Sequence, residues 1–415
     1  MTYRKTVTGL LLPVLVICLM AAACNPAHEP ATITVEEVPF DGEAAGMPWL
    51  VSLRSGGVAM SWTRTENGTP RLEYARYEDG SWSVPEVIAE QQEGEEWFVN
   101  WADFPSLVEL EDGRLAAHYL VSSGENIFAY DVHITHSDPD GNWMPSVVPH
   151  TDGTQTEHGF VSLLPWQDNG LMAIWLDGRN TSGGHYGHGG GPMTLRSAVL
   201  GTDGLSHEFE LDSAVCDCCQ TSAVRLPGGG ALAVYRDRTP DEIRDISFVR
   251  FRNGTWEEPR VLHHDGWEIF GCPVNGPAIV AIGENVAVAW FTQPGDTARV
   301  KVAFSGDRGD NWTVPVIADT GYPLGRVDIL MLDEHRVLLS WISQESRDAH
   351  IMVRIINRDG LAEPPVTITS DPSLAGRAAG FPRMAKYGDD EILIAWTSVE
   401  SDRRNVQVRK IKMTH

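Results

Sequence analysis

The sequence predicts an all-β fold: a β-propeller of seven four-stranded blades, with six blades as the alternative. Two observations carry this prediction. A short apolar strand that ends in an aromatic residue occurs seven times, at intervals of 51 to 60 residues. A polar turn with glycine and usually tryptophan recurs between the copies, as in EDGSWSVP, DPDGNWMP and RNGTWEEP. Even repetition of a multi-stranded unit is typical of propeller blades.

Each copy of the repeated strand is predicted to be the second strand of a blade. A strand such as FPSLVEL (104–110) precedes it, and a strand such as ISFVRF (246–251) follows it. A fourth strand, such as VPEVIA (84–89), leaves the polar turn. Apolar runs such as VAMSW suit strands that are buried on both faces between neighbouring blades. The seven copies end at Trp62, Tyr119, Trp175, Tyr235, Trp290, Trp341 and Trp396.

The last repeat has only three strands and ends in NVQVRKIKM. The N-terminal segment TITVEEVPF (32–40) belongs to no repeat of its own. We expect it to supply the missing fourth strand, because this pairing closes the ring and leaves no free sheet edge.

Composition and charge narrow the function classes. The chain contains 40 Gly, 25 Pro and 14 Trp, which argues against a helical bundle. Its formal net charge of −25 argues against nucleic acid or an anionic lipid surface as a partner. We expect a monomer that meets the membrane only through a lipid anchor.

The first 23 residues have the pattern of an export signal: Arg4 and Lys5, then an apolar stretch too short to span a membrane, then three alanines. Small residues directly before Cys24 resemble a bacterial lipobox. The resemblance implies an exported bacterial lipoprotein, periplasmic or on the outer membrane or cell surface, with lipid on Cys24. An ordinary cleaved signal is the alternative. Residues 24–31 are then a tether, and residues 32–415 form one propeller domain.

Strand direction sorts the loops between the two faces of the propeller. Loops that enter a blade and loops between its second and third strands share one face, whereas the polar turns lie on the opposite face. Ligands of propellers are expected on the first face, at the mouth of the central channel. The loops assigned to this face span 95–103, 154–159, 176–192, 214–222, 236–245, 263–276 and 321–328.

Cys18 leaves with the signal and Cys24 would carry lipid, so the domain keeps four cysteines. All four lie in these loops: Cys216, Cys218 and Cys219 in AVCDCCQTS, and Cys272 in the loop that enters the next blade. Disulfides are one interpretation, since an exported protein meets an oxidising environment. A soft-metal site is the second, because thiolates with one or two imidazoles suit Cu(I) or Zn(II), with His158 as a candidate ligand. Free thiols for redox chemistry are the third.

Two histidines and three tryptophans on this face each have a functional and a structural interpretation. His185 and His188 lie in the glycine-rich run GGHYGHGGGP and are either ligands or solvated loop residues. Trp97, Trp101 and Trp267 either stack on sugar rings or pack the loops onto the blades.

The turn SGDRGDNW (305–312) resembles the Asp box of sialidases, S-x-D-x-G-x-x-W, and HSDPDGNW (136–143), DGSW (79–82) and NGTW (253–256) are weaker copies. This resemblance covers the whole repeat region, roughly 33–413. It supports the propeller type and carries little information about chemistry, because Asp boxes are structural turns in many non-enzymes.

The resemblance to sialidases implies a particular set of site residues. Three arginines would bind the substrate carboxylate, a Tyr–Glu pair would act as the nucleophile, and an aspartate would be the acid/base. The first arginine usually lies in an F-R-I-P stretch, and the corresponding GMPWLVSL (46–53) contains no arginine. The candidates in this chain are Asp103 and Glu157 as carboxylates, Arg236 and Arg326 as arginines, and Tyr322 as the phenol. Arg179, Arg244, Arg383, Asp245 and Asp328 are further loop-face candidates.

These patterns favour a surface propeller that binds a glycan-type or small ligand. If the protein is an enzyme, it would hydrolyse that ligand. The alternative is a copper- or zinc-binding protein that uses the four cysteines. A scaffold for a protein partner is the second alternative.

Overall fold

The computed structural model of the chain describes residues 1–2, 32–181, 190–201, 204–206, 208–401 and 403–414. The export segment, Cys24, the tether, and His185 and His188 lie outside the described residues. In the described part, no helix has the length and the apolar character needed to traverse a bilayer.

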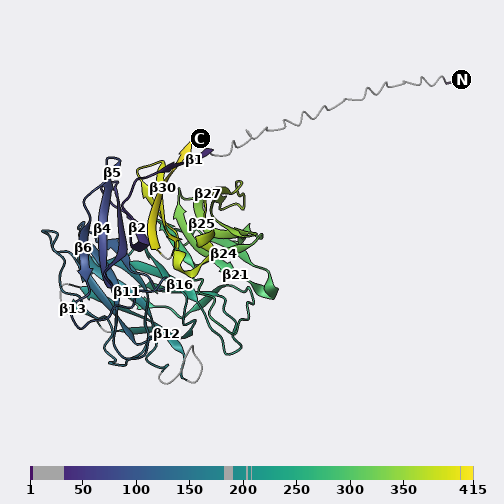
Figure 1. The fold of residues 1–415 in the computed structure, drawn as a ribbon. Helices are drawn as coiled ribbons and strands as arrows, with labels where there is room; N and C mark the ends of the chain where they lie inside the picture. Colours follow the sequence, from purple (N-terminus) through teal and green to yellow (C-terminus); the bar gives the residue numbers. More distant parts are fainter. Residues whose placement is uncertain (3–31, 182–189, 202–203, 207, 402, 415) are drawn as a thin grey trace.

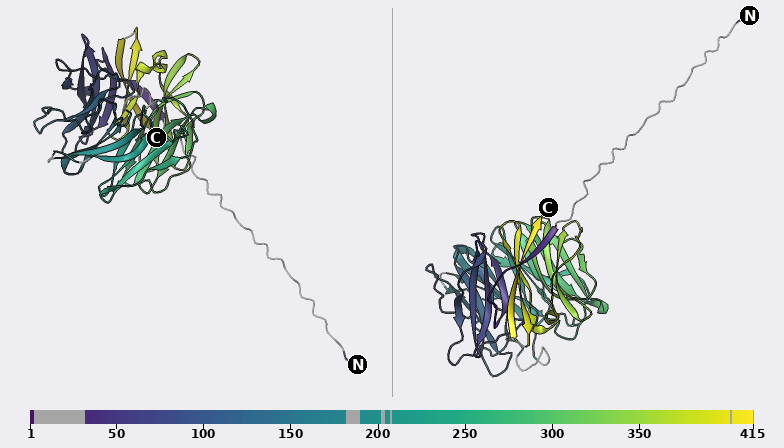
Figure 2. Two further views of the ribbon diagram at one scale, coloured as in Figure 1. Left: turned by 90° about the horizontal axis from the view of Figure 1, so that it is seen from below. Right: turned by 45° about the horizontal axis from the view of Figure 1, so that its top comes forward.

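The described residues form seven antiparallel sheets that follow one another around one axis, which confirms the predicted seven-bladed propeller (Figures 1 and 2). The first strand of each blade contacts the first strand of the next blade, and the last contacts the first, so the ring is closed. These strands are β2 (Ala45–Ser52), β7 (Ser106–Glu109), β10 (His158–Trp166), β15 (Ser222–Leu226), β20 (Ala278–Ile282), β24 (Pro323–Met331) and β28 (Arg383–Tyr387).

The repeated apolar strand of the sequence is the second strand of every blade. The aromatic residue at its end is buried in six blades and half-buried at Tyr119. Several of these rings donate to a buried carboxylate, for example Trp175 Nε1 to Asp177 at 2.9 Å and Trp341 Nε1 to Asp319 at 2.7 Å. The second strands are β3 (Val58–Glu66), β8 (Leu115–Ser122), β11 (Gly170–Asp177), β16 (Gly230–Arg236), β21 (Asn285–Thr292), β25 (Arg336–Glu345) and β29 (Glu391–Glu400).

The outer strands are less regular than the sequence suggests. The second blade has three strands, and its fourth position is a single bridge between Ile134 and Val147. The third strands are β4 (Thr69–Glu78), β9 (Tyr130–His136), β12 (Met193–Gly201), β17 (Ile246–Arg252), β22 (Arg299–Ser305), β26 (Asp348–Asn357) and β30 (Arg403–Thr414). The outermost strands are β5 (Ser81–Trp82), β6 (Glu86–Glu90), β13 (Gly204–Leu205), β14 (Phe209–Val215), β18 (Thr255–Trp256), β19 (Arg260–His263), β23 (Val316–Asp319) and β27 (Val366–Ser370). Short 3₁₀ turns are η1 (Gln167–Asn169), η2 (Pro294–Asp296), η3 (Pro372–Ala375) and η4 (Arg377–Ala379).

The ring closes as predicted. Strand β1 (Thr32–Glu37) pairs with β30 in antiparallel register, from Thr32 opposite Thr414 to Glu37 opposite Arg409. Figure 1 shows this purple strand beside the yellow C-terminal strand. The outer edge of the last blade is therefore covered by a strand from the other end of the domain.

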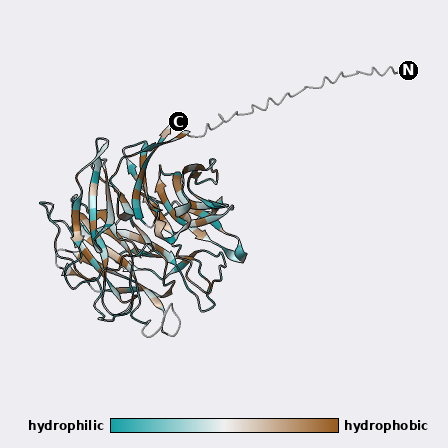
Figure 3. Cartoon of the chain, in the orientation of Figure 1, coloured by the Kyte–Doolittle hydropathy of each residue, from teal (hydrophilic) through white to brown (hydrophobic). Residues whose placement is uncertain are grey.

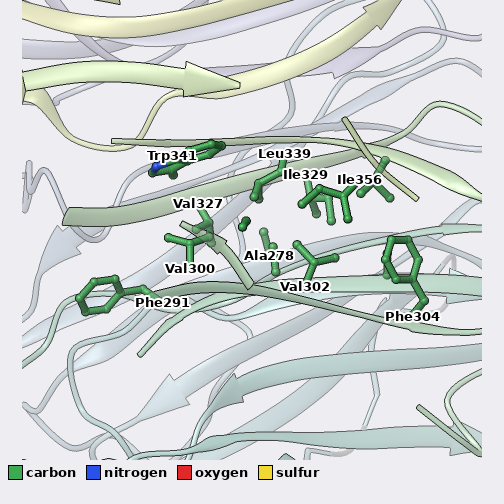
Figure 4. Close-up of a cluster of buried hydrophobic side chains, with 14 of the residues drawn as sticks. Ala278, Phe291, Val300, Val302, Phe304, Val327, Ile329, Leu339, Trp341 and Ile356 are labelled. Atoms are coloured by element: carbon green, nitrogen blue, oxygen red, sulfur yellow. The ribbon is translucent and has the colours of Figure 1, made fainter. Parts of the chain in front are cut away.

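The hydrophobic core consists of layers between neighbouring blades, and apolar segments alternate with polar loops along the chain (Figure 3). In one layer, Phe291, Val300 and Phe304 of the fifth blade pack on Ile329 and Trp341 of the sixth (Figure 4). A blade buries both faces in this way, which is why its central strands are apolar without alternation.

The Asp-box turn lies between β22 and β23, away from the loop face. Asp307 accepts hydrogen bonds from the backbone and side-chain nitrogens of Asn311 at 2.9 and 2.7 Å, and from Ser305 Oγ at 2.7 Å. Burial alone would raise the pKa of Asp307, but the bonds from Asn311 and Ser305 lower it to about 2. The box therefore stabilises a turn and has no part in the site described below.

Candidate functional site

A cavity of about 950 Å³ opens among the loops of the predicted ligand face. Its wall comes from the loops of the second to fifth blades, with one contribution from the loop that enters the seventh blade. The apolar lining includes Phe98, Trp101, Ile127, Phe128, Phe160 and Val274. The polar lining includes Asn100, Asp103, Asn126, Tyr130, Gln155, Glu157, Asp217, Cys218, Cys272 and Arg377.

Three of these residues form a compact acidic group around one phenol. The hydroxyl of Tyr130 lies 2.9 Å from Asp103 Oδ2 and 2.8 Å from Glu157 Oε1. The backbone N–H of Phe160 donates to Asp103 Oδ1 at 2.7 Å. A phenol carries a single proton, so both contacts of Tyr130 are hydrogen bonds only when one carboxyl group is protonated.

Burial accounts for that proton. Desolvation raises the pKa of Asp103 to about 7, although the bonds from Phe160 and Tyr130 oppose the shift. Desolvation also raises the pKa of Glu157 well above its ordinary value, and the charge of Asp103 adds to the effect. The two carboxyl groups therefore titrate as a coupled pair that holds a proton near neutral pH.

A bulge at the start of β10 creates this arrangement. The pairing with β11 shifts register between Gly159 and Ser162, and Phe160 has a positive φ of 53°. The bulge turns the Phe160 N–H toward Asp103. A Cβ on Gly159 would lie 1.9 Å from Asp103 Oδ2, so only glycine leaves room for the carboxyl group.

The sequence predicted Asp103 and Glu157, and the structure brings these two together. The sequence analysis did not identify Tyr130. This residue begins β9, at the end of the loop between the second and third strands of its blade. The sorting of loops by face applies equally to this loop, so the same argument extended to residues 123–130 would have included the phenol.

The structure does not bring Arg236, Arg326 or Tyr322 to the cavity wall. Arg236 is buried and donates to the carbonyl oxygens of Asn275 and Phe291 at 2.7 Å. Arg326 is buried and donates to the carbonyl oxygens of three residues on the neighbouring loop, Leu374, Gly376 and Gly380. Tyr322 is 73% exposed on the rim of a different blade.

The other loop-face arginines also pair within the protein. Arg179 donates to Asp177, Arg244 to Glu242, and Arg383 lies 3.5 Å from Asp328 and over the ring of Trp49. Asp245 accepts from the backbone N–H groups of Gly266 and Trp267. These residues brace loops, and Arg377 is the remaining guanidinium of the described lining.

The three tryptophans were expected either to stack on sugar rings or to pack the loops onto the blades, and the structure distinguishes between these roles. Trp97 is buried and stacks on Tyr119 with ring centroids 4.4 Å apart, and Trp267 is buried under Arg236. Only Trp101 of the three lines the cavity.

The three cysteines of the CDCC loop lie together beside the cavity: Cys218 lines it, whereas Cys216 and Cys219 are buried. Cys216 Sγ lies 3.4 Å from Cys219 Sγ and 3.8 Å from Cys218 Sγ. These distances exceed the S–S bond of about 2.05 Å, and all four described cysteines are free. Cys272 is exposed and approaches Cys218 and Asp217, all three offering ligand atoms within 4.8 Å of one another.

Donor groups surround the cysteine sulfurs. Arg244 Nη1 lies 3.2 Å from Cys216 Sγ, and the backbone N–H of Asn275 lies 3.4 Å from Cys219 Sγ. Burial opposes ionisation of Cys216, but hydrogen bonds from Cys218 and Cys219 and the charge of Arg244 lower its pKa well below the ordinary value. The loop thus favours negative charge on Cys216.

His158 belongs to a different cluster from the cysteines with which it was predicted. Its ring stacks on His150 with centroids 3.7 Å apart and planes 4° from parallel. Asp131 Oδ1 lies 3.5 Å from His158 Nδ1, and Asp152 Oδ1 lies 3.2 Å from His158 Nε2. Burial would lower the pKa of His158, but Asp131, Asp177 and Asp152 outweigh burial and raise it.

The neighbouring imidazole shows the opposite shift. Burial and the charge of His158 lower the pKa of His150 to about 4. Ligand atoms of Asp131, His150 and His158 lie within 4.8 Å of one another, as do those of Asp152, His158 and Asp177, so this cluster also has the donors of a metal site. The opposite pKa shifts favour the charged form of His158 and the neutral form of His150.

A scan against protein-family models matches none, and a search of curated proteins finds no match. Solved structures share the fold at low identity. A protein of unknown function from Dyadobacter fermentans has a TM-score of 0.53 and 14% identity, covering 92% of this chain and 99% of that chain. An ulvan lyase of polysaccharide lyase family PL25 has a TM-score of 0.55 and 11% identity, with coverage of 90% and 95%. An endosialidase of phage phi92 has a TM-score of 0.49 and 10% identity, with coverage of 92% and 69%. The likeness to the Dyadobacter protein and to the ulvan lyase shows a shared propeller fold.

Proposed function

We propose that this protein binds an oligosaccharide in the cavity of the loop face, with Glu157 as the proton-bearing group that meets the sugar. The observation that carries the proposal is the cavity itself: about 950 Å³, lined by aromatic rings and by a carboxyl pair that shares the phenol of Tyr130.

The lining suits the two surfaces of a sugar ring. Trp101, Ile127 and Phe128 offer apolar area to the C–H face, whereas Asn100, Asn126 and Gln155 offer amide groups to hydroxyls. Pockets of roughly 300–1,000 Å³ with a few convergent polar groups are typical of small-ligand sites. The neighbours support the ligand class, since the ulvan lyase structure has also been solved bound to -[GlcA(1-4)Rha3S]-.

Acid–base chemistry is available at the same place. A carboxyl group whose pKa is raised by burial stays protonated at neutral pH and can donate to a glycosidic oxygen. Glu157 is half-buried and reaches the cavity, whereas Asp103 lies deeper and is 2% exposed. Glu157 is therefore the candidate donor, and Asp103 tunes it through Tyr130.

The wall argues against sialic acid as the ligand. A grip by three arginines needs guanidinium groups that are free to meet one carboxylate, and the described loop-face arginines already bind backbone oxygens or acids. Arg377 alone can meet one carboxylate or sulfate substituent of a sugar.

We also propose that the domain is exported and anchored by lipid on Cys24, on the strength of the N-terminal sequence. Mass spectrometry of the mature N-terminus tests this: an acylated Cys24 supports the anchor, and an unmodified N-terminus elsewhere overturns it. The protein-scaffold alternative stays a prediction.

Binding of the full chain to a panel of neutral, uronate-containing and sulfated oligosaccharides tests the proposed function. We expect a ligand whose affinity falls about tenfold or more in Glu157→Gln, because loss of one hydrogen bond to a buried group costs about 1–2 kcal/mol. Glu258→Gln is the matched control, since Glu258 is exposed on the Asp-box side.

Absence of any bound glycan, or equal affinity in the two variants, overturns the proposal. New reducing ends or unsaturated products from the bound glycan distinguish cleavage from binding alone.

A further inference from the structure

We propose that Cys216, Cys218 and Cys219 form a three-thiolate site for Cu(I) beside the cavity, which Cys218 lines. The site is separate from the acidic group around Tyr130 and goes beyond glycan binding.

The sulfur positions fit one shared ion. Metal–sulfur bonds of about 2.3 Å place sulfurs about 3.8–4.0 Å apart in tetrahedral or trigonal shells. Cys216 Sγ lies 3.8 Å from Cys218 Sγ, which matches this spacing, and 3.4 Å from Cys219 Sγ, which must move apart by a few tenths of an ångström around an ion. The three Sγ atoms all lie within 4.8 Å of one another.

The surroundings complete a second layer of donors. Arg244 at 3.2 Å and the Asn275 N–H at 3.4 Å point at Cys216 and Cys219, and they offset the negative charge of a copper–thiolate group. Hydrogen bonds of this kind orient ligands and tune affinity in metal sites. Arg244 is itself held by Glu242 at 2.6 Å.

The number of sulfurs selects the metal. Structural zinc requires four ligands in a tetrahedron, whereas three thiolates are a complete soft shell for Cu(I). Cys272 approaches Cys218 and Asp217 but does not belong to the group formed by Cys216 and Cys219. It is exposed and lines the cavity beside Cys218. Cys272 therefore lies outside the three-thiolate group.

Titration of the full chain with Cu(I) under anaerobic conditions, against a Cu(I) chelator of known affinity, tests the site. We expect one tightly held Cu(I) per chain and an X-ray absorption spectrum with a shell of three sulfurs. Cys218→Ser should weaken Cu(I) binding at least tenfold, because Cys218 is only half-buried and its replacement leaves two thiolates. Near-UV circular dichroism checks that the variant is folded.

Cys272→Ser is the matched control and should keep both stoichiometry and the three-sulfur shell. Equal loss in Cys272→Ser and Cys218→Ser would replace the three-thiolate site with a four-ligand one and overturn the proposal. Tighter binding of Zn(II) than of Cu(I) would also overturn it, as would fewer than four titratable thiols in the metal-free domain of residues 32–415. Glycan binding measured on metal-free protein keeps this outcome independent of the proposed function.

Discussion

At the scale of single residues, the phenol of Tyr130 decides the character of the cavity. It places two carboxyl groups within 2.9 Å of one oxygen, and burial keeps a proton in the group. The sequence indicated Asp103 and Glu157 because their loops share a face. It could not indicate that Arg236 and Arg326 turn away, since the carbonyl oxygens that bind them come from other blades.

The raised pKa of Asp103 makes stability depend on pH. The pKa moves from 3.8 in the unfolded chain to about 7 in the fold, so the folded state binds the proton more tightly. The contribution is fully present below about pH 4 and is lost as the pH rises through about 7. Asp103→Asn mimics the protonated carboxyl and should remove this part of the pH dependence.

Thermal unfolding of both proteins between pH 4 and 8 measures the effect. Tm of the variant should fall less than Tm of the wild type, by about 1 °C for each kcal/mol of linkage, because the unfolding entropy grows with the size of the domain. Parallel curves for the two proteins would contradict a protonated Asp103.

At the scale of elements, β-bulges in the first strands of three blades set the direction in which the adjoining loops leave the sheet. Bulges occur at Gly46–Met47, Gly159–Phe160 and Gly325–Arg326, and the second residue of each pair has a positive φ. Bulges of this kind bend a strand end and redirect side chains, and they are frequent beside sites. The sequence showed the glycines, but a glycine before a strand does not by itself reveal a bulge.

Gly159→Ala tests this role. The added methyl group would meet Asp103 Oδ2 at 1.9 Å and Tyr130 Cε2 at 2.8 Å, so the acidic group must shift. We expect a loss of about 1–3 kcal/mol in the free energy of unfolding, as for overpacked cores, together with weaker glycan binding.

Gly201→Ala is the control within the same blade, because nothing lies within 4 Å of its added Cβ. Chemical denaturation measures both variants. If Gly159→Ala and Gly201→Ala unfold at the same denaturant concentration, the tight packing at Gly159 is wrong.

At the scale of the whole molecule, stability depends on closure. The seven first strands contact one another around the axis, and β1 joins the two ends of the domain (Figure 2). Ile33 and Val35 of β1 pack on the core layer between the last two blades. The ion pairs of Glu36 with Lys410 and Lys412 lie on the surface and add little.

A chain that begins at residue 38 should therefore be less stable than one that begins at residue 32, by about 2 kcal/mol for two half-buried aliphatic side chains and a lost strand. It should also self-associate, because the outer edge of β30 becomes free to pair. Thermal unfolding and sedimentation velocity compare the two chains. Equal Tm and an unchanged monomer would show that β1 is dispensable.

The sequence by itself determined the architecture of this protein. Seven copies of one aromatic-ended strand, evenly spaced, leave few alternatives to a seven-bladed ring, and the orphan N-terminal strand matches the three-stranded last repeat. Local periodicity is enough here because each blade repeats the same contacts with its neighbours.

Only the tertiary structure decided the chemistry of the loop face. Side chains from different blades meet there, so their distances depend on the ring as a whole: Tyr130 between Asp103 and Glu157, and Arg244 beside Cys216. His158 was predicted beside the cysteines, but in the tertiary structure it packs against His150 and the aspartates. Strand patterns fix which face a loop occupies, but desolvation and contacts across blades decide which of its groups carry protons, bind neighbours or reach the cavity.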